Sequence, residues 1–249
     1  MTAPVFLVDP ADLDTDPVLV TGAEGRHAAT VRRIGVGETV HLVDGAGNRA
    51  HCVVTAVGRD TVTCAVRERV HEEAPVPRIT VVQALPKGDR GELAVEVMTE
   101  AGVDAVVPWQ AERCVTRWRG DRAAKALAKW RSAARAAAKQ ARRSRIPEIA
   151  EPAGRAEEVA ELLASASLGI VLHEEGAVRL SELELPEKLS APGGHVVLVV
   201  GPEGGFTDAE LAAFEAVGAV RALLGPTVLR TSTAGVAALA VLQARCGRW

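Results

Sequence analysis

The stretch HVVLVVGPEGGFTDAEL, residues 195–211, constrains the fold of this chain more than any other segment. Residues 195–200 are almost wholly apolar, which is the pattern of a central parallel strand buried on both faces. A glycine-rich turn follows, and Thr207 then stands three residues before Glu210, the spacing of a capping box. A buried strand, a tight turn and a capped helix in succession predict an α/β domain.

The same alternation of strands and helices extends from residue 79 to residue 244. The strand-like segments are 79–84, 103–109, 168–173, 195–200 and 220–224, and the helix-like segments are 89–101, 121–143, 155–165, 208–217 and 233–244. Such alternation predicts a mainly parallel sheet. We therefore expect an α/β domain over residues 74–249, and the edge where strands end and helices begin is where such domains bind ligands.

Residues 1–73 follow a different rhythm, which predicts a separate β domain. Apolar and more polar residues alternate over 61–67, the period of a half-buried strand. The turn sequences DGAGN at 44–48 and VGRD at 57–60 indicate hairpins. EEAPVP at 72–77 is typical of a linker. Short strands, tight turns and no long helix together predict a small β-barrel.

Charge is distributed unevenly along the chain. From Arg113 to Arg145 there are twelve Lys or Arg residues and one acid, Asp121, so this stretch carries +11. Because the whole chain carries −3, the remainder carries −14. A segregated basic block on an acidic protein indicates a polyanionic partner, which we interpret as RNA. A solvated surface helix is the alternative explanation.

Within this block, the predicted helix 121–143 has one narrow apolar stripe. The stripe consists of Leu127, Trp130, Ala134, Ala138 and Ala141. Arg131, Arg135, Lys139 and Arg142 lie to one side of it, and Lys125 and Lys129 continue the polar face. Repulsion between these cations is uncompensated unless phosphates supply the counter-charge, so RNA binding through this segment should weaken steeply with salt.

The glycine-rich turn after residue 200 is not a phosphate-binding loop of a known kind. The chain has neither the Walker pattern nor the dinucleotide fingerprint. Glu203 within the turn would repel phosphate, so a cationic or hydroxyl-bearing ligand suits it better. Gly201, Gly204 and Gly205 would let the backbone approach such a ligand closely. A tight turn that merely joins a strand to a helix is the alternative.

A second strand, turn and helix follow at 220–244. Gly225 and Pro226 form the turn, and Ser232 or Thr233 can cap the helix. The exposed backbone groups of this loop could read a purine edge, and Arg230 is its one strong cation. Arg230 could instead pair with an acid or cap a helix carbonyl. The two loops together predict one wall of a pocket.

Composition excludes several classes of protein. The four cysteines are far apart and no His stands at metal-ligand spacing, so we expect buried thiols and no metal site. No apolar run approaches the roughly 20 residues of a membrane span, and the N-terminus has no charged-then-apolar leader. A cytoplasmic protein with no membrane partner is expected. Aromatic residues make up only 3%, which argues against a broad aromatic platform for RNA bases.

Four ordered segments resemble the RsmE family of 16S rRNA uridine-N3 methyltransferases, of the SPOUT class. The segments GPEGGF and LGPTVLRTSTA resemble its paired signature. GRHAATVRRIGVGETVHLVDGAG (25–47) resembles its PUA-like barrel, QALPKGDRGELAVEVMTEAGVDAVVPWQAERCV (83–115) its catalytic-domain entry and AAAKQARRSRIPEI (136–149) its basic segment. The resemblance covers nearly the whole chain in the expected order.

This resemblance implies a C-terminal trefoil knot, a homodimer, the cofactor S-adenosylmethionine, and a uridine of the small ribosomal subunit near the decoding site as substrate. It implies cofactor contacts from Leu172, His173, Val200, Gly201, Pro202, Gly204, Leu224, Gly225, Leu229, Thr231, Thr233 and Ala234. The residues that we expect at RNA phosphates are Arg33, Arg131, Arg135, Lys139, Arg142 and Arg143. We assign Arg230 to stabilisation of charge during methyl transfer and Glu203 to orientation of cofactor or RNA, with His173 a weaker candidate for the base.

Two departures from the family pattern leave alternatives open. Ser232 stands where the family commonly has Glu, and Val5 stands where the family often has an Arg before its aromatic residue. An RNA-binding or assembly protein without catalysis is therefore one alternative. A methyltransferase for a ribose 2′-oxygen or a tRNA base is another, and a nucleotide-binding regulator is a third.

Overall fold

The computed structural model describes residues 3–249, which form two compact units. The first unit extends to Ala74 and also contains residues 138–146, and the second comprises 75–137 and 147–249. The segment 138–146 contains the last three residues of the basic helix, which ends at Gln140, and the residues after it. The sequence predicts this segment within the α/β domain, and that boundary is wrong. No helix within the described residues is long and apolar enough to cross a membrane.

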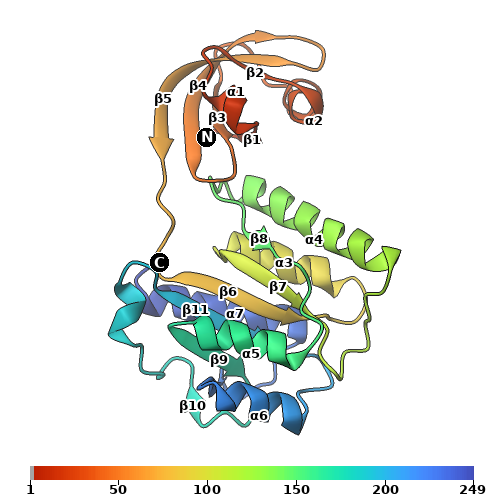
Figure 1. Ribbon diagram of the computed structural model, residues 1–249. Coiled ribbons are helices and arrows are strands. Elements are labelled where there is room, and N and C mark those ends of the chain that lie inside the picture. Colours follow the sequence, from red (N-terminus) through yellow and green to blue (C-terminus); the bar gives the residue numbers. More distant parts are fainter. Residues whose placement is uncertain (1–2) are drawn as a thin grey trace. The chain divides into compact units, whose positions relative to one another are not determined.

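The first unit is built on a five-stranded sheet with the order β1-β3-β4-β5-β2. Its strands are β1 (Val5–Leu7), β2 (Val18–Val20), β3 (Thr39–Val43), β4 (Asn48–Val57) and β5 (Val62–His71). Only β1 and β3 pair in parallel. The long β4–β5 hairpin curls over the unit (Figure 1). Both predicted hairpins are confirmed, at 44–48 and at 57–60.

This unit also contains three short helical segments that its sequence does not predict. They are α1 (Pro10–Leu13), α2 (Gly22–Arg26) and a π-helix at His27–Val31. Each has five residues or fewer, so none spans enough turns to show a helical period.

The first hairpin illustrates how local chemistry fixes a turn. The carboxylate Oδ1 of Asp44 accepts hydrogen bonds from the N–H groups of Ala46 (2.7 Å) and Asn48 (3.1 Å). Burial alone would raise the pKa of Asp44, but these bonds and one from the Asn48 side chain outweigh it and lower the pKa. Gly45 and Gly47 both have positive φ, which the turn requires.

The second unit has a seven-stranded, wholly parallel sheet with the order β10-β12-β9-β11-β6-β7-β8. Its strands are β6 (Arg78–Ala84), β7 (Ala105–Trp109), β8 (Glu148–Ile149), β9 (Leu168–Leu172), β10 (Val178–Arg179), β11 (His195–Val200) and β12 (Val220–Leu223). The expected α/β domain with a parallel sheet is confirmed. The C-terminal trefoil knot that the family resemblance implies stays a prediction.

Helices cover both faces of this sheet. They are α3 (Arg90–Glu100), α4 (Asp121–Gln140), α5 (Ala156–Ser165), α6 (Asp208–Ala216) and α7 (Thr231–Arg245), with a short 3₁₀ helix at Glu187–Ser190. α3 and α7 pack together on one face, and α5 and α6 pack together on the other (Figure 1). The helices begin within two residues of their predicted starts, and α4 ends three residues before its predicted end.

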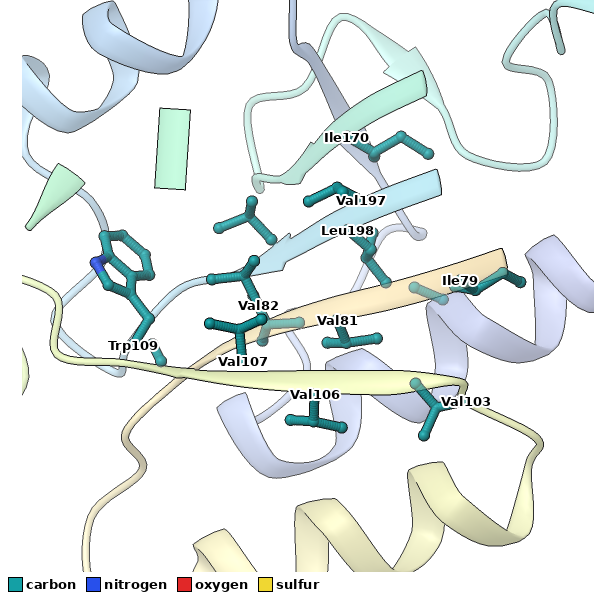
Figure 2. Close-up of a cluster of buried hydrophobic side chains, with 14 of the residues drawn as sticks. Ile79, Val81, Val82, Val103, Val106, Val107, Trp109, Ile170, Val197 and Leu198 are labelled. Carbon is teal, nitrogen blue, oxygen red and sulfur yellow. The ribbon is translucent and has the colours of Figure 1, made fainter. Parts of the chain in front are cut away.

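The core of the second unit lies between the sheet and its helices. Figure 2 shows part of it, where side chains from neighbouring strands meet, among them Ile79, Val81, Val82, Val106, Val107, Ile170, Val197 and Leu198. β11 lies between β9 and β6, and five of its six residues are buried. The prediction of a central strand buried on both faces is therefore confirmed.

The stripe predicted on α4 is also confirmed over its first four positions. Leu127, Trp130, Ala134 and Ala138 are all buried. The fifth, Ala141, lies beyond the end of the helix and is only partly buried.

Three of the four cysteines are buried free thiols, as the sequence predicts, and Cys246 is partly exposed. Burial raises the pKa of Cys52 to about 11 and that of Cys64 to about 12. These thiols therefore remain protonated at neutral pH and act as small apolar side chains.

Candidate active site

The candidate site is built from three loops at one edge of the parallel sheet. Because parallel strands end at the same edge, the residues at or directly after the ends of β9, β11 and β12 lie side by side. These residues are 172–173, 201–205 and 224–230. In sheet order β9 lies between β12 and β11, so the two Gly-Pro loops are separated by the end of β9. All segments predicted to hold the cofactor meet at this edge.

Hydrogen bonds fix these loops to their neighbours. The N–H of Lys87, after β6, donates to Glu203 Oε1 at 3.1 Å. The guanidinium of Arg113, after β7, donates to the carbonyl of Gly204 at 3.3 Å. The buried side-chain amide of Gln83 donates to the carbonyl of Thr231 at 3.2 Å. These hydrogen bonds therefore connect the ends of β6 and β7 to the turn at 201–205 and to the start of α7.

The turn at 201–205 lies against an aromatic cluster. Phe206 contacts Trp109 with a ring separation of 5.9 Å and Phe214 with one of 6.3 Å. A Cβ added at Gly201 would come within 2.6 Å of the Phe206 ring, and one at Gly204 within 2.9 Å of Arg113. Glycine is therefore required at both positions by close packing, as well as allowing a ligand to approach.

The predicted capping box is confirmed and has a second role. Thr207 and Glu210 cap α6 reciprocally, with Glu210 Oε2 accepting from the Thr207 N–H at 2.8 Å. Glu210 is buried, and its Oε1 accepts from the N–H of Glu112 at 2.8 Å. One carboxylate therefore joins the start of α6 to the loop after β7.

The loop 224–230 has the features of a ligand-binding segment. Within residues 3–249, the backbone groups of 224–229 make no hydrogen bond. The same loop exposes two apolar side chains, Val228 at 77% and Leu229 at 39%, and nothing lies within 4 Å of a Cβ added at Gly225. Unpaired amides beside exposed apolar groups fit an adenosine-like ligand, whose purine has a polar edge and apolar faces. The donor set therefore fits S-adenosylmethionine.

Arg230 lies at the end of this loop, directly before α7. Its carbonyl accepts from the N–H groups of Thr233 and Ala234, both at 2.9 Å. Its exposed guanidinium makes no ion pair or hydrogen bond with any described residue. The alternatives in which the Arg230 side chain pairs with an acid or caps a helix carbonyl are therefore not observed.

The predicted helix cap at Ser232 or Thr233 is wrong, because α7 begins at Thr231. Ser232 is buried in the first turn, and the Thr233 hydroxyl donates to the carbonyl of Arg230 at 3.3 Å. The first turn closes on the residue before Thr231, because the carbonyl of Arg230 accepts from the N–H groups of Thr233 and Ala234.

His173 is partly buried beside Phe206, with ring centroids 6.0 Å apart. Its Nδ1 accepts a hydrogen bond from the N–H of Glu175 at 3.0 Å. A neutral ring whose Nδ1 is an acceptor carries its proton on Nε2. That nitrogen cannot take a proton from a substrate, which argues against His173 as the base.

The expected RNA-binding cations occupy different environments. In the second unit, Arg131 pairs with Glu151 at 2.9 Å, whereas Arg135 is exposed and no described residue forms an ion pair with it. In the first unit, Lys139 pairs with Glu24 at 2.7 Å, and both side chains are largely buried. Arg33 and Arg142 stand at positive φ. The ion pair withdraws Lys139 from contact with phosphate.

Several residues of the site were not identified from the sequence. Gln83, Lys87, Arg113 and Glu210 all fix the loops, yet none was proposed as a site residue. In three of these contacts the partner is a backbone group, of Thr231, Glu112 or Gly204. Every residue has such groups, so the sequence does not show which of them form these bonds. Only the position of Gln83 at the end of an apolar strand could have marked it.

The comparisons with known proteins agree with this geometry. Residues 72–243 match the family described as RNA methyltransferase domain, and residues 20–67 match the RNA methyltransferase PUA domain. The fold and the site thus define an RNA methyltransferase with an N-terminal PUA domain.

Named relatives and solved structures narrow the class further. The chain is 46% identical to ribosomal RNA small subunit methyltransferase E of Mycobacterium bovis, over 100% of this chain and 94% of the relative. It is 30% identical to the Bacillus subtilis protein of that name, over 90% and 88%. The Neisseria gonorrhoeae protein of that name, bound to S-adenosyl methionine, matches with a TM-score of 0.83, 28% identity and 98% coverage of both chains. The chain belongs to the ribosomal RNA small subunit methyltransferase E family.

Proposed function

We propose that this chain transfers a methyl group from S-adenosylmethionine to N3 of a uridine in 16S rRNA, near the decoding site, giving 3-methyluridine. The observation that carries the proposal is the sheet edge at 172–173, 201–205 and 224–230. Within residues 3–249 this edge combines unpaired backbone groups at 224–229, the exposed apolar side chains of Val228 and Leu229, and the guanidinium of Arg230, which has no partner there. The names of the relatives and the cofactor bound in two similar structures support it.

In this proposal the three loops hold the cofactor. The contacts come from Leu172, His173, Val200, Gly201, Pro202, Gly204, Leu224, Gly225, Leu229, Thr231, Thr233 and Ala234. The backbone of 224–229 reads the adenine edge, while Leu229 covers an apolar face. When bound, S-adenosylmethionine supplies an electrophilic methyl group on its sulfonium.

Arg230 and Glu203 act on the substrate side of the loops. The N3–H of uracil is a weak acid that loses its proton to solvent, so the nucleophile is the deprotonated ring, whose negative charge spreads onto O2 and O4. N3 takes the methyl group as the bond from that carbon to sulfur breaks, which gives S-adenosylhomocysteine as the second product. The guanidinium of Arg230 stabilises that charge, and fixed donors of this kind act most strongly where charge develops. Glu203 Oε1 is held by the Lys87 N–H, which leaves Oε2 to orient the cofactor or the RNA. The uridine must be unpaired, because N3 is occupied in a base pair.

We assign the contacts with RNA phosphates to cations in each unit. Among the three assigned residues on α4, Arg131, Arg135 and Lys139, Arg135 is the best placed, because it is exposed and no described acid pairs with it. Arg131, Arg142 and Arg143 are further candidates, and Lys139 contributes through the fold of the first unit. Arg33 is the residue that we assign to a phosphate contact in the PUA-like domain of residues 1–73. We propose that this domain helps to hold RNA. Because ribosomes are the target, we place the protein in the cytoplasm.

Removal of one phosphate contact should reduce the salt dependence of RNA binding. For Arg135→Ala we expect the slope of log affinity against log salt to fall by about 0.7, the value for one contact with a single strand. The measurement is RNA affinity at several salt concentrations. Arg155→Ala is the control, because it also removes one exposed cation but from a residue paired with Glu158. Equal slopes for wild type and Arg135→Ala would exclude the assigned contact.

We also propose that two copies associate through α3 and α7. Residues 236–242 of α7 read VAALAVL, so the helix is apolar on every side. A helix of this kind is normally buried all round, yet Val236, Ala237, Ala240 and Val241 are only partly buried. On α3, which packs against α7, Leu93 is 46% exposed. A second copy would cover this face.

A charge at this face should separate the copies. We expect wild type to run near twice the chain mass of 26.1 kDa and Leu93→Glu near the single mass, because an unpaired carboxylate is costly to bury. Light scattering after size exclusion gives both masses. Leu19→Glu is a matched control, since Leu19 is 50% exposed on β2. A monomeric wild type, or a dimeric Leu93→Glu protein, would contradict the assigned face.

The function is tested by methyl transfer from labelled S-adenosylmethionine to ribosomal subunits. Small subunits from a strain that lacks the homologous activity should acquire label, and large subunits should not. Transfer RNA is tested as a third acceptor, and label in it alone would mean that the enzyme has a different substrate. Failure to bind the cofactor at all would favour an RNA-binding or assembly protein without catalysis.

A further inference from the structure

A cavity of about 320 Å³ lies beside the candidate active site, in the second unit. It opens between the loop that follows β6 and the first half of α4. Two indoles, Trp118 and Trp130, contribute to its wall. The function proposed above makes no use of this cavity.

The aromatic part of the wall is fixed by close packing. The rings of Trp118 and Trp130 are 5.2 Å apart and meet edge to face at 81°. Trp130 is buried against Gly91, where an added Cβ would come within 2.6 Å of the indole Nε1. Trp130 can therefore occupy this position only because residue 91 has no side chain. The result is a rigid aromatic surface with Trp118 only partly buried.

The rim of the cavity is cationic. Arg122, Lys125 and Lys129 line it, all three are exposed, and within residues 3–249 none of their side chains forms an ion pair or hydrogen bond. Asp89 and Glu92 also line it, at the start of α3, where the positive end of the helix dipole stabilises acids. Three cations therefore face two acids, and the acids can accept hydrogen bonds from a base.

The cavity lies next to a residue that contacts the candidate active site. Pro86 lines the cavity and directly precedes Lys87, whose N–H donates to Glu203. The hydroxyl of Thr116, also in the lining, donates to the carbonyl of Pro86 at 2.7 Å. Neither Glu203 nor Arg230 lines the cavity. An occupant would thus be close to the reacting uridine without being that uridine.

We propose that the cavity binds a second unpaired nucleotide of the RNA substrate, with its base stacked on the Trp118 indole, which the buried Trp130 holds in place, and its phosphate at Arg122, Lys125 and Lys129. This inference rests on the proposed function. Unpaired RNA bases are recognised by stacking on aromatic side chains, and phosphates by nearby cations. The site holds the substrate strand at a fixed point beside the methylated position. It therefore contributes to the choice of uridine and not to the chemical step.

Kinetics on small ribosomal subunits test this role. Trp118→Ala should raise the KM for subunits by about 5- to 150-fold, the loss expected for one stacked base. The kcat and the affinity for S-adenosylmethionine should stay near wild type. Trp118→Phe should recover part of the loss because it keeps a ring. Lys125→Ala leaves the packing of the fold intact and should also raise KM, whereas Lys188→Ala, at an exposed lysine outside the lining, should not.

Chemical probing of unpaired bases identifies the nucleotide. Wild type should protect the methylated uridine and one further base, and Trp118→Ala should lose only the second protection. Absence of a second protected base, or an unchanged KM in both Trp118→Ala and Lys125→Ala, would overturn the inference while methylation by wild type stands. A wild type that neither binds nor methylates small subunits would instead overturn the proposed function, and this inference with it.

Discussion

Arg230→Ala should lower the kcat of methyl transfer by about 10²–10³-fold, the loss typical when one fixed donor to a developing negative charge is removed. The affinity for S-adenosylmethionine should change little, because the loop 224–229 offers its backbone to the cofactor and the Arg230 side chain is not needed for that contact. The Arg230 side chain has no hydrogen bond or ion pair among the described residues, so its truncation breaks no such internal interaction. Single-turnover rates and cofactor titration measure the two effects separately.

Arg221→Ala is the matched control for this substitution. Arg221 lies on β12, close in sequence to the same loop, and pairs with Glu215 at 2.6 Å near the surface. Its removal subtracts the same charge and should leave the rate within a few-fold of wild type. If Arg230→Ala lost cofactor affinity and rate in equal measure, the side chain would hold the cofactor and would have no special role in the transition state.

Asp104→Ala should reduce the free energy of unfolding of the second unit by about 3–5 kcal/mol, the usual cost of removing one partner of a buried ion pair. Asp104 and Arg248 are only 14% and 9% exposed, and their Oδ2 and Nη1 atoms are 2.7 Å apart. Asp104 also accepts a hydrogen bond from the N–H of Ile79 at 2.8 Å. Its loss would leave a buried guanidinium without its counter-charge at the start of β6.

Denaturant unfolding measures this change, and the chain has a suitable comparison pair. Arg78 and Glu148 are 2.8 Å apart, close to the 2.7 Å of the Asp104–Arg248 pair, but their side chains are 51% and 63% exposed. An exposed pair contributes at most about 1 kcal/mol, so Glu148→Ala should have a small effect. Similar losses for Asp104→Ala and Glu148→Ala would mean that burial does not determine the contribution of these pairs.

The strands and long helices of the second unit were predictable because their apolar patterns are strong. β11 consists almost entirely of buried residues, and the stripe on α4 has helical spacing. The short strands β8 and β10 have only two residues each, so no pattern exists to detect. The same reason explains the missed short helices in the first unit.

The site was predictable at the level of its loops but not of its contacts. Glycine, proline and charged residues marked 201–205 and 224–230 in the sequence. The bonds from Lys87 to Glu203 and from Arg113 to Gly204 join residues 116 and 91 positions apart, and each uses a backbone group. The pair of Lys139 with Glu24, 115 positions apart, shows equally that a run of cations does not reveal which of them are already neutralised.

The most direct test of the central claim is the identity of the methylated nucleoside. Small ribosomal subunits from a strain lacking the homologous activity would be incubated with the protein and labelled S-adenosylmethionine, and their RNA digested to nucleosides. We expect label in 3-methyluridine, and we expect Arg230→Ala to remove most of that label. Label in a 2′-O-methylated nucleoside or in another methylated base would contradict the assigned reaction.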